Sequence, residues 1–280
     1  MTGHKKETIY TISWQIGSVL CAGIYYSGIL FCYECFRKKL LKRYRTHVLM
    51  YHRIRNDGRD SDISVSTRNF QKQMQYLKQN LNVVSLNTLV NNIRKGAYIP
   101  ADRLAITFDD GYKDNFLNAY PVLKKYKLPA TIFLISQFVG DSEDMLNTSE
   151  ITIMKKDNID FGSHTATHKI LAEADLETVS RELIDSKKDI EYILKEKVDF
   201  FAYPKGKREH FNNHIKEQVK KVGYRAAFVT ENGEITSSDD LFELKRIGIR
   251  NYPLFVFQVR LSGLLECRPV YFIRKCFGLT

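Results

Sequence analysis

The stretch between residues 36 and 266 contains no cysteine, although the chain of 280 residues has five cysteines in all. An odd number, with none in that stretch, matches no disulfide framework. Cys32 and Cys35 have the spacing of a redox or zinc pair, but no second pair stands at zinc-finger distance. The sequence also lacks internal repeats and low-complexity segments, so we expect an ordinary globular protein whose main part does not depend on cysteine chemistry.

Acidic residues are fewer than basic ones, 32 against 43, which gives a net charge of +11. Basic chains can bind nucleic acid, but no helix-turn-helix, zinc-finger or RNA-binding signature accompanies the charge, and no nucleic-acid partner is expected. Much of the excess lies in one run that has no acidic residue and would attract an anionic lipid surface or an acidic glycan. Its members are Arg37, Lys38, Lys39, Lys42, Arg43 and Arg45.

The segment from Thr8 to Phe36 has a single charged residue, Glu34. Its apolar part, Ile9–Tyr33, is long enough to cross a bilayer, which takes about 20 residues. A cleaved signal peptide has a shorter apolar core and a small-residue cleavage site, so we favour an uncleaved membrane anchor over a cleaved signal. The predicted organisation is an anchor or signal-anchor (1–36), a basic juxtamembrane linker (37–47), one large domain (48–252) and an apolar, basic extension (253–280).

Short apolar runs alternate with helix-like patterns in the rest of the chain. We expect one clear helix from Leu176 to Lys195, with Asp175 as its N-cap. This alternation predicts a parallel α/β sheet, closed or nearly closed into a TIM-like barrel, whose chemistry lies at the carboxyl ends of the strands. The eight expected strands are residues 47–52, 82–85, 103–108, 130–135, 159–162, 199–203, 226–230 and 245–249.

Two adjacent carboxylates, Asp109 and Asp110, end the third of these strands and precede Gly111. Side chains alternate along a strand, so one carboxylate can bind a metal ion while its neighbour turns toward a substrate. Gly111 permits the sharp turn that follows. An acidic turn of the Asp-Gly kind has the same residues, so this motif alone does not decide between the two.

A pair of histidines, His164 and His168, follows the strand expected at 159–162. Two imidazoles four residues apart face the same way in one helical turn and can share a metal ion. With Asp110 they make a set of two histidines and one carboxylate with open positions, which suits zinc, or else cobalt, nickel or manganese. Both motifs fall at predicted strand ends, as chemistry in a barrel requires.

A third motif, Phe200–Gly206 with Tyr203, Pro204 and Lys205 at its centre, ends the strand at 199–203 and can present backbone N–H groups to a bound oxygen. With the other two motifs, the chain resembles the polysaccharide deacetylases of the NodB-homology type (carbohydrate esterase family 4), and within them the poly-N-acetylglucosamine deacetylases. The resemblance covers roughly residues 46 to 265. It is carried by LMYHR at 49–53, ITFDDG at 106–111, PATIF at 129–133, FGSHTATH at 161–168 and FAYP at 201–204.

This resemblance implies a distorted (β/α) barrel that hydrolyses an N-acetyl group from an amino sugar, with a glycan containing N-acetylglucosamine as partner. It implies that Asp109 is the general base and Asp110 a metal ligand, with an oxyanion donor near Lys205. A divalent metal polarises the carbonyl and lowers the pKa of water, and the base takes a proton from that water as it attacks.

The chain departs from the family pattern in two places. Many members have a late histidine as general acid, but this chain has none after His214; we take His52 as the first candidate and His210 and His214 as weaker ones. Many members also carry an arginine in the third motif that orients the base, where this chain has Ala202. Two late arginines are candidates to replace it, Arg246 and Arg250.

Three functions stay open on this basis: a deacetylase, a catalytically weak relative that binds glycan, and a metal-dependent O-acetyl esterase. The location is ambiguous as well. Basic residues after the apolar segment favour the cytoplasmic side for the catalytic domain, whereas the resemblance implies an extracytoplasmic one.

Overall fold

The structure, a computed structural model, describes residues 17–56, 63–96 and 102–264. The chain divides into two compact units, residues 45–251 and residues 1–44 with 252–280. The larger unit contains every predicted strand. Cys267, Cys276 and the end of the predicted extension lie outside the described residues.

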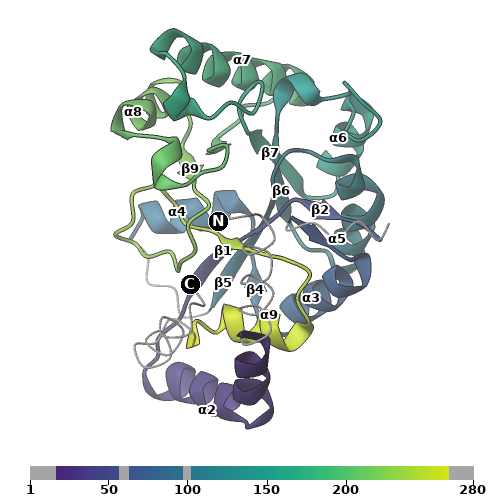
Figure 1. The fold of residues 1–280 in the computed structure, drawn as a ribbon, viewed down its shortest axis with the longest axis vertical. Coiled ribbons are helices and arrows are strands. Elements are labelled where there is room, and N and C mark those ends of the chain that lie inside the picture. Colours follow the sequence, from purple (N-terminus) through teal and green to yellow (C-terminus); the bar gives the residue numbers. More distant parts are fainter. Residues whose placement is uncertain (1–16, 57–62, 97–101, 265–280) are drawn as a thin grey trace, which may run out of the picture. The chain divides into compact units, whose positions relative to one another are not determined.

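A parallel sheet forms the centre of the larger unit (Figure 1). Its strands follow the order β10-β1-β5-β6-β7-β8-β9, and β4 pairs with β5 beside this path. All eight strands predicted from the sequence are present, most with shorter bounds. They are β1 (Thr46–Tyr51), β4 (Asn82–Val83), β5 (Arg103–Phe108), β6 (Ala130–Leu134), β7 (Ile159–Ser163), β8 (Phe200–Ala202), β9 (Ala226–Phe228) and β10 (Ile247–Gly248).

The expected closure of the barrel is only partial. Strands β9 and β10 do not pair; a single bridge between Phe228 and Leu244 joins the two ends of the sheet. The reason is length, because β9 has three residues and β10 two, too few to form a continuous ladder. The result is a curled half-barrel. Two further short strands that the sequence did not suggest, β2 (Arg53–Ile54) and β3 (Ser64–Val65), pair with each other.

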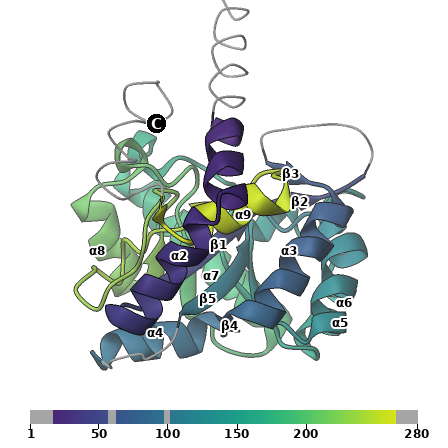
Figure 2. The same cartoon turned by 90° about the horizontal axis from the view of Figure 1, so that it is seen from below.

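Most helices of the larger unit line the outer side of the sheet, with α3 (Thr67–Asn80) packed against α5 (Tyr120–Tyr126) and α6 (Thr148–Lys155) beside them (Figures 1 and 2). Several begin after a Ser, Asn or Asp whose side chain accepts a hydrogen bond from the third N–H of the helix, which explains where they start. The helices are α3 (Thr67–Asn80), α4 (Leu86–Arg94), α5 (Tyr120–Tyr126), α6 (Thr148–Lys155), α7 (Leu176–Leu194) and α8 (Asn213–Lys221), and the caps are Ser66, Ser85, Asn147, Asp175 and Asn212.

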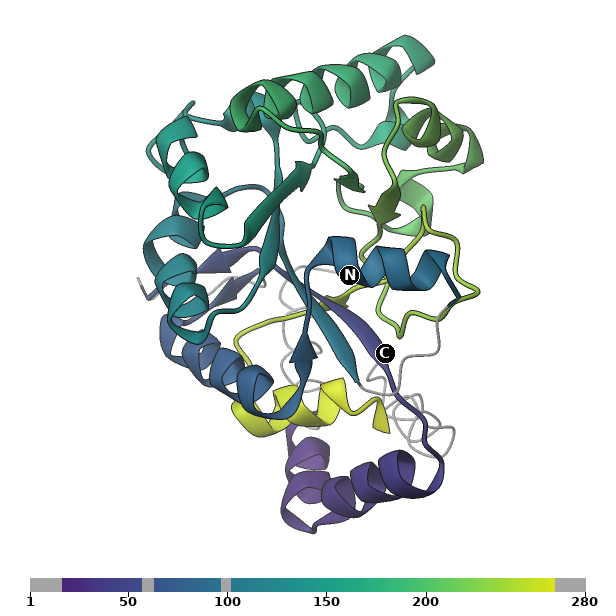
Figure 3. The ribbon, with the colours of Figure 1, turned by 180° about the vertical axis from the view of Figure 1, so that it is seen from behind.

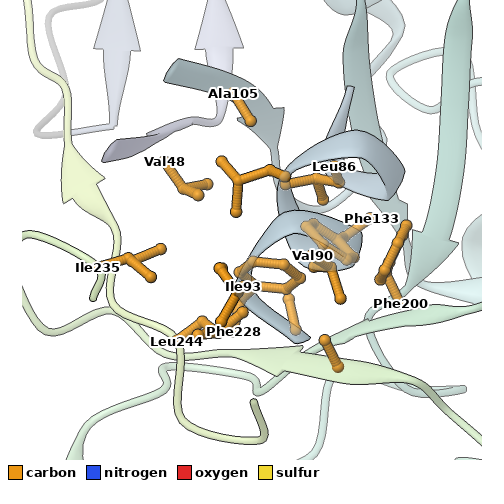
Figure 4. Packing of buried hydrophobic residues seen from close by; sticks show 13 residues of the cluster. Val48, Leu86, Val90, Ile93, Ala105, Phe133, Phe200, Phe228, Ile235 and Leu244 are labelled. Atoms are coloured by element: carbon orange, nitrogen blue, oxygen red, sulfur yellow. The ribbon is translucent and has the colours of Figure 1, made fainter. Parts of the chain in front are cut away.

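The inner side of the curled sheet is filled by α4 (Figures 3 and 4). Its apolar face packs on small and aromatic side chains that point inward from the strands, among them Ala105, Phe133 and Phe228. Helix α7 confirms the predicted helix and its cap: the Asp175 carboxylate accepts from the Thr178 N–H at 2.7 Å. Leu176, expected on the buried face, is exposed instead.

The part of the smaller unit that the structure describes does not show the predicted single membrane helix. Among the residues described, none of the helices combines the length and the apolar character that a bilayer crossing needs; only Gly17–Tyr26 and Ile29–Leu40 taken together do, and these meet at 66°. Gly28, with φ of 80°, makes the break, which a uniform apolar pattern does not reveal. The stretch Ile9 to Ile16 of the predicted anchor lies outside the described residues.

The two arms of this bent pair consist of α2 (Ile29–Cys35), continued by a π-helical turn (Phe36–Leu40), and the helix before it. Part of the predicted C-terminal extension forms α9 (Leu254–Leu261) in the same unit. Apolar side chains of α9 and of the first arm share one buried cluster, including Ile24, Val256 and Val259. The first half of the extension therefore packs on the first arm of the bent pair.

Candidate active site and metal centre

The predicted site residues gather at the carboxyl ends of the central strands. Asp109 and Asp110 follow β5 directly, and the Asp109 N–H continues the ladder by donating to the Tyr51 carbonyl at 2.9 Å. His52 follows β1, and His164 follows β7. The predicted site residues thus lie at the end of the strands where parallel barrels keep their chemistry.

The Asp109 carboxylate is buried against the guanidinium of Arg246, which is itself fully buried. Arg246 donates from Nη1 to Oδ1 at 2.6 Å and from Nη2 to Oδ2 at 2.8 Å. Its Nε donates to the Val229 carbonyl at 3.1 Å, and its Nη1 also contacts Thr107 Oγ1 at 3.3 Å. Of the two arginines suggested by the sequence, Arg246 is the one that contacts Asp109; Arg250 lies four residues further on.

Opposing influences act on the pKa of Asp109. Burial raises it, but the charge and hydrogen bonds of Arg246, together with His164 and His52, hold the pKa of Asp109 well below its usual range. The carboxylate is therefore ionised at neutral pH. Each of its oxygens accepts one bond from Arg246 and keeps a second lone pair that can take a proton.

Asp110 turns away from this pair and toward the two histidines. Its φ of 75° is in the left-handed region, as is that of Gly111 at 78°, so the chain reverses at once after the strand. A side chain at Gly111 would be strained by this positive φ, and its Cβ would lie 2.7 Å from Leu134 Cδ2, which would have to move. The two neighbouring carboxylates therefore face different side chains, Asp109 toward Arg246 and Asp110 toward the histidines.

Asp110, His164 and His168 each direct a ligand atom to one point, all within 4.8 Å of one another. The Nε2 atoms lie 3.5 Å (His164) and 3.4 Å (His168) from Asp110 Oδ1. That oxygen is buried without a hydrogen-bond partner in the structure, which is costly unless a cation occupies the position beside it. The donor set, its geometry and this orphaned oxygen therefore fit a divalent metal ion.

The expected helical turn at His164–His168 is wrong. The segment is a loop in which Thr165 (φ 67°) and His168 (φ 62°) adopt left-handed conformations. The two rings still approach each other, with centroids 4.9 Å apart. A helix would continue away from the strand end, whereas the loop folds both imidazoles back over it.

A buried glutamate on α7 holds this loop, and the sequence analysis missed it. Glu182 Oε2 accepts from the N–H groups of Ala166 and Thr167, both at 2.9 Å, and Oε1 accepts from Thr167 Oγ1 at 2.6 Å. The signal was available, because Glu182 falls on the apolar face of α7, between Val179 and Leu183, where a charged residue needs partners.

Both histidines are oriented with Nε2 toward the Asp110 carboxylate. His164 Nδ1 lies 2.8 Å from the Ala202 carbonyl, which requires the proton on Nδ1 and leaves Nε2 with its lone pair. Burial, with the neighbouring His164, lowers the pKa of His168 to about 4. Lys205 is among the charges that lower it, so the third motif lies close to the metal ligands.

His52 Nε2 lies 4.0 Å from Asp109 Oδ2, and the side chain keeps 20% of its surface exposed. Burial lowers the pKa of His52, and the charges of Asp109 and Asp110 offset this only in part. The weaker candidates are elsewhere: His210 Nδ1 accepts from the Lys207 N–H at 3.3 Å, and His214 is exposed on α8.

The third motif is arranged less uniformly than expected. The Tyr203 side chain is buried, stacks on Phe211 at 4.3 Å and donates its hydroxyl to the Phe242 carbonyl at 3.2 Å. Pro204 is buried as well, whereas Lys205 is exposed and left-handed, with φ of 58°. Within the described part of the chain, no acceptor is recorded for the Lys205 N–H.

Known proteins with similar sequences and folds point to one family. The family model "Polysaccharide deacetylase" matches residues 98–227. YxkH of Bacillus subtilis, named as a polysaccharide deacetylase, is 30% identical over 207 residues, 72% of this chain and 70% of its own length. The poly-beta-1,6-N-acetyl-D-glucosamine N-deacetylase of Staphylococcus aureus is 30% identical over 198 residues, 66% of this chain and 67% of its own.

Among solved structures, the Streptococcus pyogenes deacetylase PplD in complex with acetate superposes with a TM-score of 0.69 at 25% identity, covering 74% of this chain and 92% of that one. The fold, the order of the motifs and these relatives agree with one another. The chain belongs to the polysaccharide deacetylase family, of the NodB-homology type (carbohydrate esterase family 4), and is a deacetylase-type hydrolase.

Proposed function

We propose that this protein removes N-acetyl groups from a glycan containing N-acetylglucosamine, using a divalent metal ion held by Asp110, His164 and His168. The observation that carries the proposal is the Asp109–Arg246 pair beside these three ligands, because it places an ionised, unligated carboxylate next to a metal site. The Staphylococcus aureus relative, whose name states this reaction on poly-beta-1,6-N-acetyl-D-glucosamine, supports the choice of substrate class.

Zinc is the proposed metal, with cobalt, nickel and manganese as alternatives for the same donor set. When bound, such an ion polarises a carbonyl and lowers the pKa of water. The contribution of the chain is to present two imidazole nitrogens and one carboxylate oxygen on one side and to leave the opposite side open.

Asp109 is the proposed general base. It accepts the proton of the attacking water, and Arg246 keeps it ionised and fixed in one orientation. The backbone N–H of Lys205 is the proposed donor to the oxygen that becomes negative, since Lys205 follows β8 in the third motif and its N–H has no hydrogen-bond acceptor among the residues described. Neither the Tyr203 hydroxyl nor Pro204 can share this task, because the hydroxyl is bonded elsewhere and Pro204 lacks an N–H.

His52 is the proposed general acid, which protonates the departing amine. Its Nε2 lies 4.0 Å from Asp109 Oδ2, the oxygen to which Arg246 Nη2 donates. Burial favours the neutral imidazole, so His52 is expected to receive its proton during the reaction, from Asp109, rather than to carry it beforehand.

A glycan-binding protein without turnover is a weaker reading of the same residues. It was motivated by two absences, the arginine of the third motif and the late histidine; we propose that Arg246, which lies just before β10, takes the place of that arginine. An O-acetyl esterase would use the same groups, because ester and amide hydrolysis pass through similar oxyanions.

The test is release of acetate from β-1,6- and β-1,4-linked N-acetylglucosamine oligomers by the full chain, after chelation and addition of zinc or cobalt. We expect metal-dependent acetate that falls by roughly 10²–10⁴-fold in Asp109→Asn, the usual contribution of a general base. An O-acetylated oligomer serves as competitor. No acetate from either amide series, with metal bound stoichiometrically, would contradict the proposal, and turnover of the ester alone would favour the esterase.

We also propose that the smaller unit lies on a membrane surface rather than crossing the bilayer. Seven of the eleven large apolar side chains exposed in the described residues belong to positions 19–41, and Ile29, Phe36 and Leu40 stand at helical spacing. Lys39 and Lys42, which are exposed, follow them and suit anionic headgroups. Placement of the catalytic unit outside the cytoplasm stays a prediction of the resemblance.

Co-sedimentation of the full chain with vesicles tests this surface. We expect binding to vesicles containing phosphatidylglycerol, weaker binding to phosphatidylcholine alone or at high salt, and loss of binding in Phe36→Ser/Leu40→Ser. The matched control is Ile153→Ser/Leu176→Ser, which removes two exposed apolar residues from the larger unit. Equal binding by both double variants would contradict the proposal, as would a stable dimer whose formation depends on Phe36 and Leu40.

A further inference from the structure

His52, the proposed general acid, lies just beyond the hydrogen-bonded end of β1. The ladder between β1 and β5 ends where the Asp109 N–H donates to the Tyr51 carbonyl. His52 is the next residue, and the pairing of β2 with β3 resumes only at Arg53. The position of the His52 ring relative to Asp109 therefore depends on whatever holds this single peptide.

Side chains from the turn after Asp109-Asp110 hold it. Asn115 Nδ2 donates to the His52 carbonyl at 2.8 Å, and Asp114 Oδ1 accepts from the Ile54 N–H at 3.0 Å. Both side chains come from the start of a π-helical turn, Asn115–Ala119, a wide turn of the kind often found at functional sites. The segment that follows β5 and carries Asp109 thus continues into the turn whose side chains bond to the backbone at His52 and Ile54.

Asn115 is the central member of this contact. It is fully buried, and its Nδ2 also donates to Asp114 Oδ1 at 3.0 Å. Because both neighbours are acceptors, only the amide nitrogen can face them, and the orientation of the side chain is fixed by chemistry. Both hydrogen bonds come from Nδ2, and the buried Oδ1 has no hydrogen-bond partner in the structure, so the amide is held from its nitrogen end.

The other side of the peptide is held as well. The Arg53 guanidinium lies 3.6 Å from the centre of the Tyr112 ring and pairs with the Asp144 carboxylate, and its Nη1 is 3.4 Å from Asp114 Oδ2. Arg53 and Ile54 are therefore anchored to the same turn that anchors His52.

We propose that Asn115 is a positioning residue that sets His52 against Asp109, so that a proton taken up by the base can pass to the departing amine. The inference rests on the proposed deacetylase function and on His52 as its acid. Asn115 touches neither substrate nor metal; it acts through the His52 backbone. Small displacements of a proton donor reduce the rate strongly, because proton transfer needs hydrogen-bond distance.

A double-mutant cycle tests the proposal. We expect Asn115→Ala to lower kcat for N-acetylglucosamine oligomers by roughly tenfold, part of what an acid contributes, with KM and zinc affinity nearly unchanged. In the His52→Ala background the same substitution should have little further effect, because there is no acid left to position. Asn115→Ser keeps a hydrogen-bond donor, so its kcat should lie between those of the wild-type chain and Asn115→Ala. It replaces Asn115→Ala in the test if the alanine variant folds poorly.

The matched control is Asn118→Ala. Asn118 comes from the same turn and donates to the Ile54 carbonyl at 2.7 Å, so its loss disturbs the turn without freeing the His52 carbonyl. We expect a change in kcat of less than about twofold. Hydrolysis of p-nitrophenyl acetate gives a second readout, since its phenolate leaves without protonation and should be spared in Asn115→Ala.

Each outcome has a separate meaning. An equal loss on amide and ester, or a full loss by Asn115→Ala in the His52→Ala background, would overturn the positioning role and leave a structural one. Full amide activity of His52→Ala itself would remove His52 as the acid and the inference with it. An inactive wild-type chain with bound metal would instead refute the proposed function.

Discussion

The two halves of the site are built in opposite ways, although they start from neighbouring residues. On the base side, Asp109 and Arg246 come from the sheet and its margin, and every bond of the guanidinium that the structure describes is directed to a buried acceptor. On the metal side, Asp110, His164 and His168 come from left-handed turns and a loop, and one buried oxygen has no partner.

The difference shows how the fold separates the two proposed tasks, proton transfer by Asp109 and metal binding by the other three residues. A base must stay ionised and in place, which a fully paired, strand-supported carboxylate achieves. Metal ligands must converge from several directions and leave their lone pairs free, which needs irregular backbone and a partner such as Glu182 that stabilises it. Variants that change one half of the site at a time test this comparison.

The largest effect is expected from the two aspartates themselves. Asp110→Asn should lower zinc affinity by roughly 100-fold or more, at least as much as the loss of an outer partner of a ligand costs. Asp109→Asn should leave the affinity nearly unchanged. Isothermal titration of the chelated chain with zinc measures both. Similar losses of zinc affinity in the two variants would mean that Asp109 also binds the metal, and would contradict the separation of the two halves.

Arg246 should matter for stability as well as rate. Arg246→Met leaves a buried carboxylate without its partner, which typically costs about 3–5 kcal/mol in the free energy of unfolding. Adding Asp109→Asn removes the stranded charge and should restore much of the loss. Urea unfolding measures this, with Arg225→Met as control, because Arg225 pairs with Asp199 at a partly exposed site and should cost at most about 1 kcal/mol. No recovery in the double variant would count against a paired base.

Glu182 should affect only the metal half. Glu182→Gln keeps the shape but loses the charge that accepts three hydrogen bonds from the loop, and zinc affinity should fall by about tenfold. Glu177→Gln, an exposed change on the same helix, is the control. Binding followed through the visible spectrum of the cobalt form also reports ligand geometry. An unchanged affinity and spectrum would show that the loop holds its shape without Glu182.

The smallest effect concerns pH on the base side. Burial raises the pKa of Asp114 from 3.8 to about 6, despite the Ile54 N–H and the Arg53 charge. A raised carboxyl pKa favours folding while the group is protonated, so this contribution is present at low pH and is lost as pH rises from about 4 to about 6. Relative to Asp114→Asn, the wild-type chain should lose roughly 1–3 kcal/mol across that range. Parallel unfolding curves for the two chains would contradict this.

The prediction of the fold succeeded where the signal is local. Strand β5 was found with its bounds correct, because a run of apolar residues ended by Asp-Asp-Gly states both the strand and its stop. Helix α7 was found because its cap and its apolar period agree. The break at Gly28 was missed, and the lengths of β9 and β10 were overestimated. Hydrophobicity encodes neither a bend in a helix nor the number of residues that pair in a strand.

By itself the sequence determined the chemistry available: two carboxylates at one strand end, two histidines at another, and their order along the chain, which also carry the family resemblance. Only the tertiary structure decided which groups meet. Arg246 lies 137 positions from Asp109 and reaches it because β10 pairs with β1, which pairs with β5. Long-range pairing of this kind depends on the register of several strands at once, and so no local pattern could choose Arg246 over Arg250, or place Glu182 and Asn115 behind the histidines they hold.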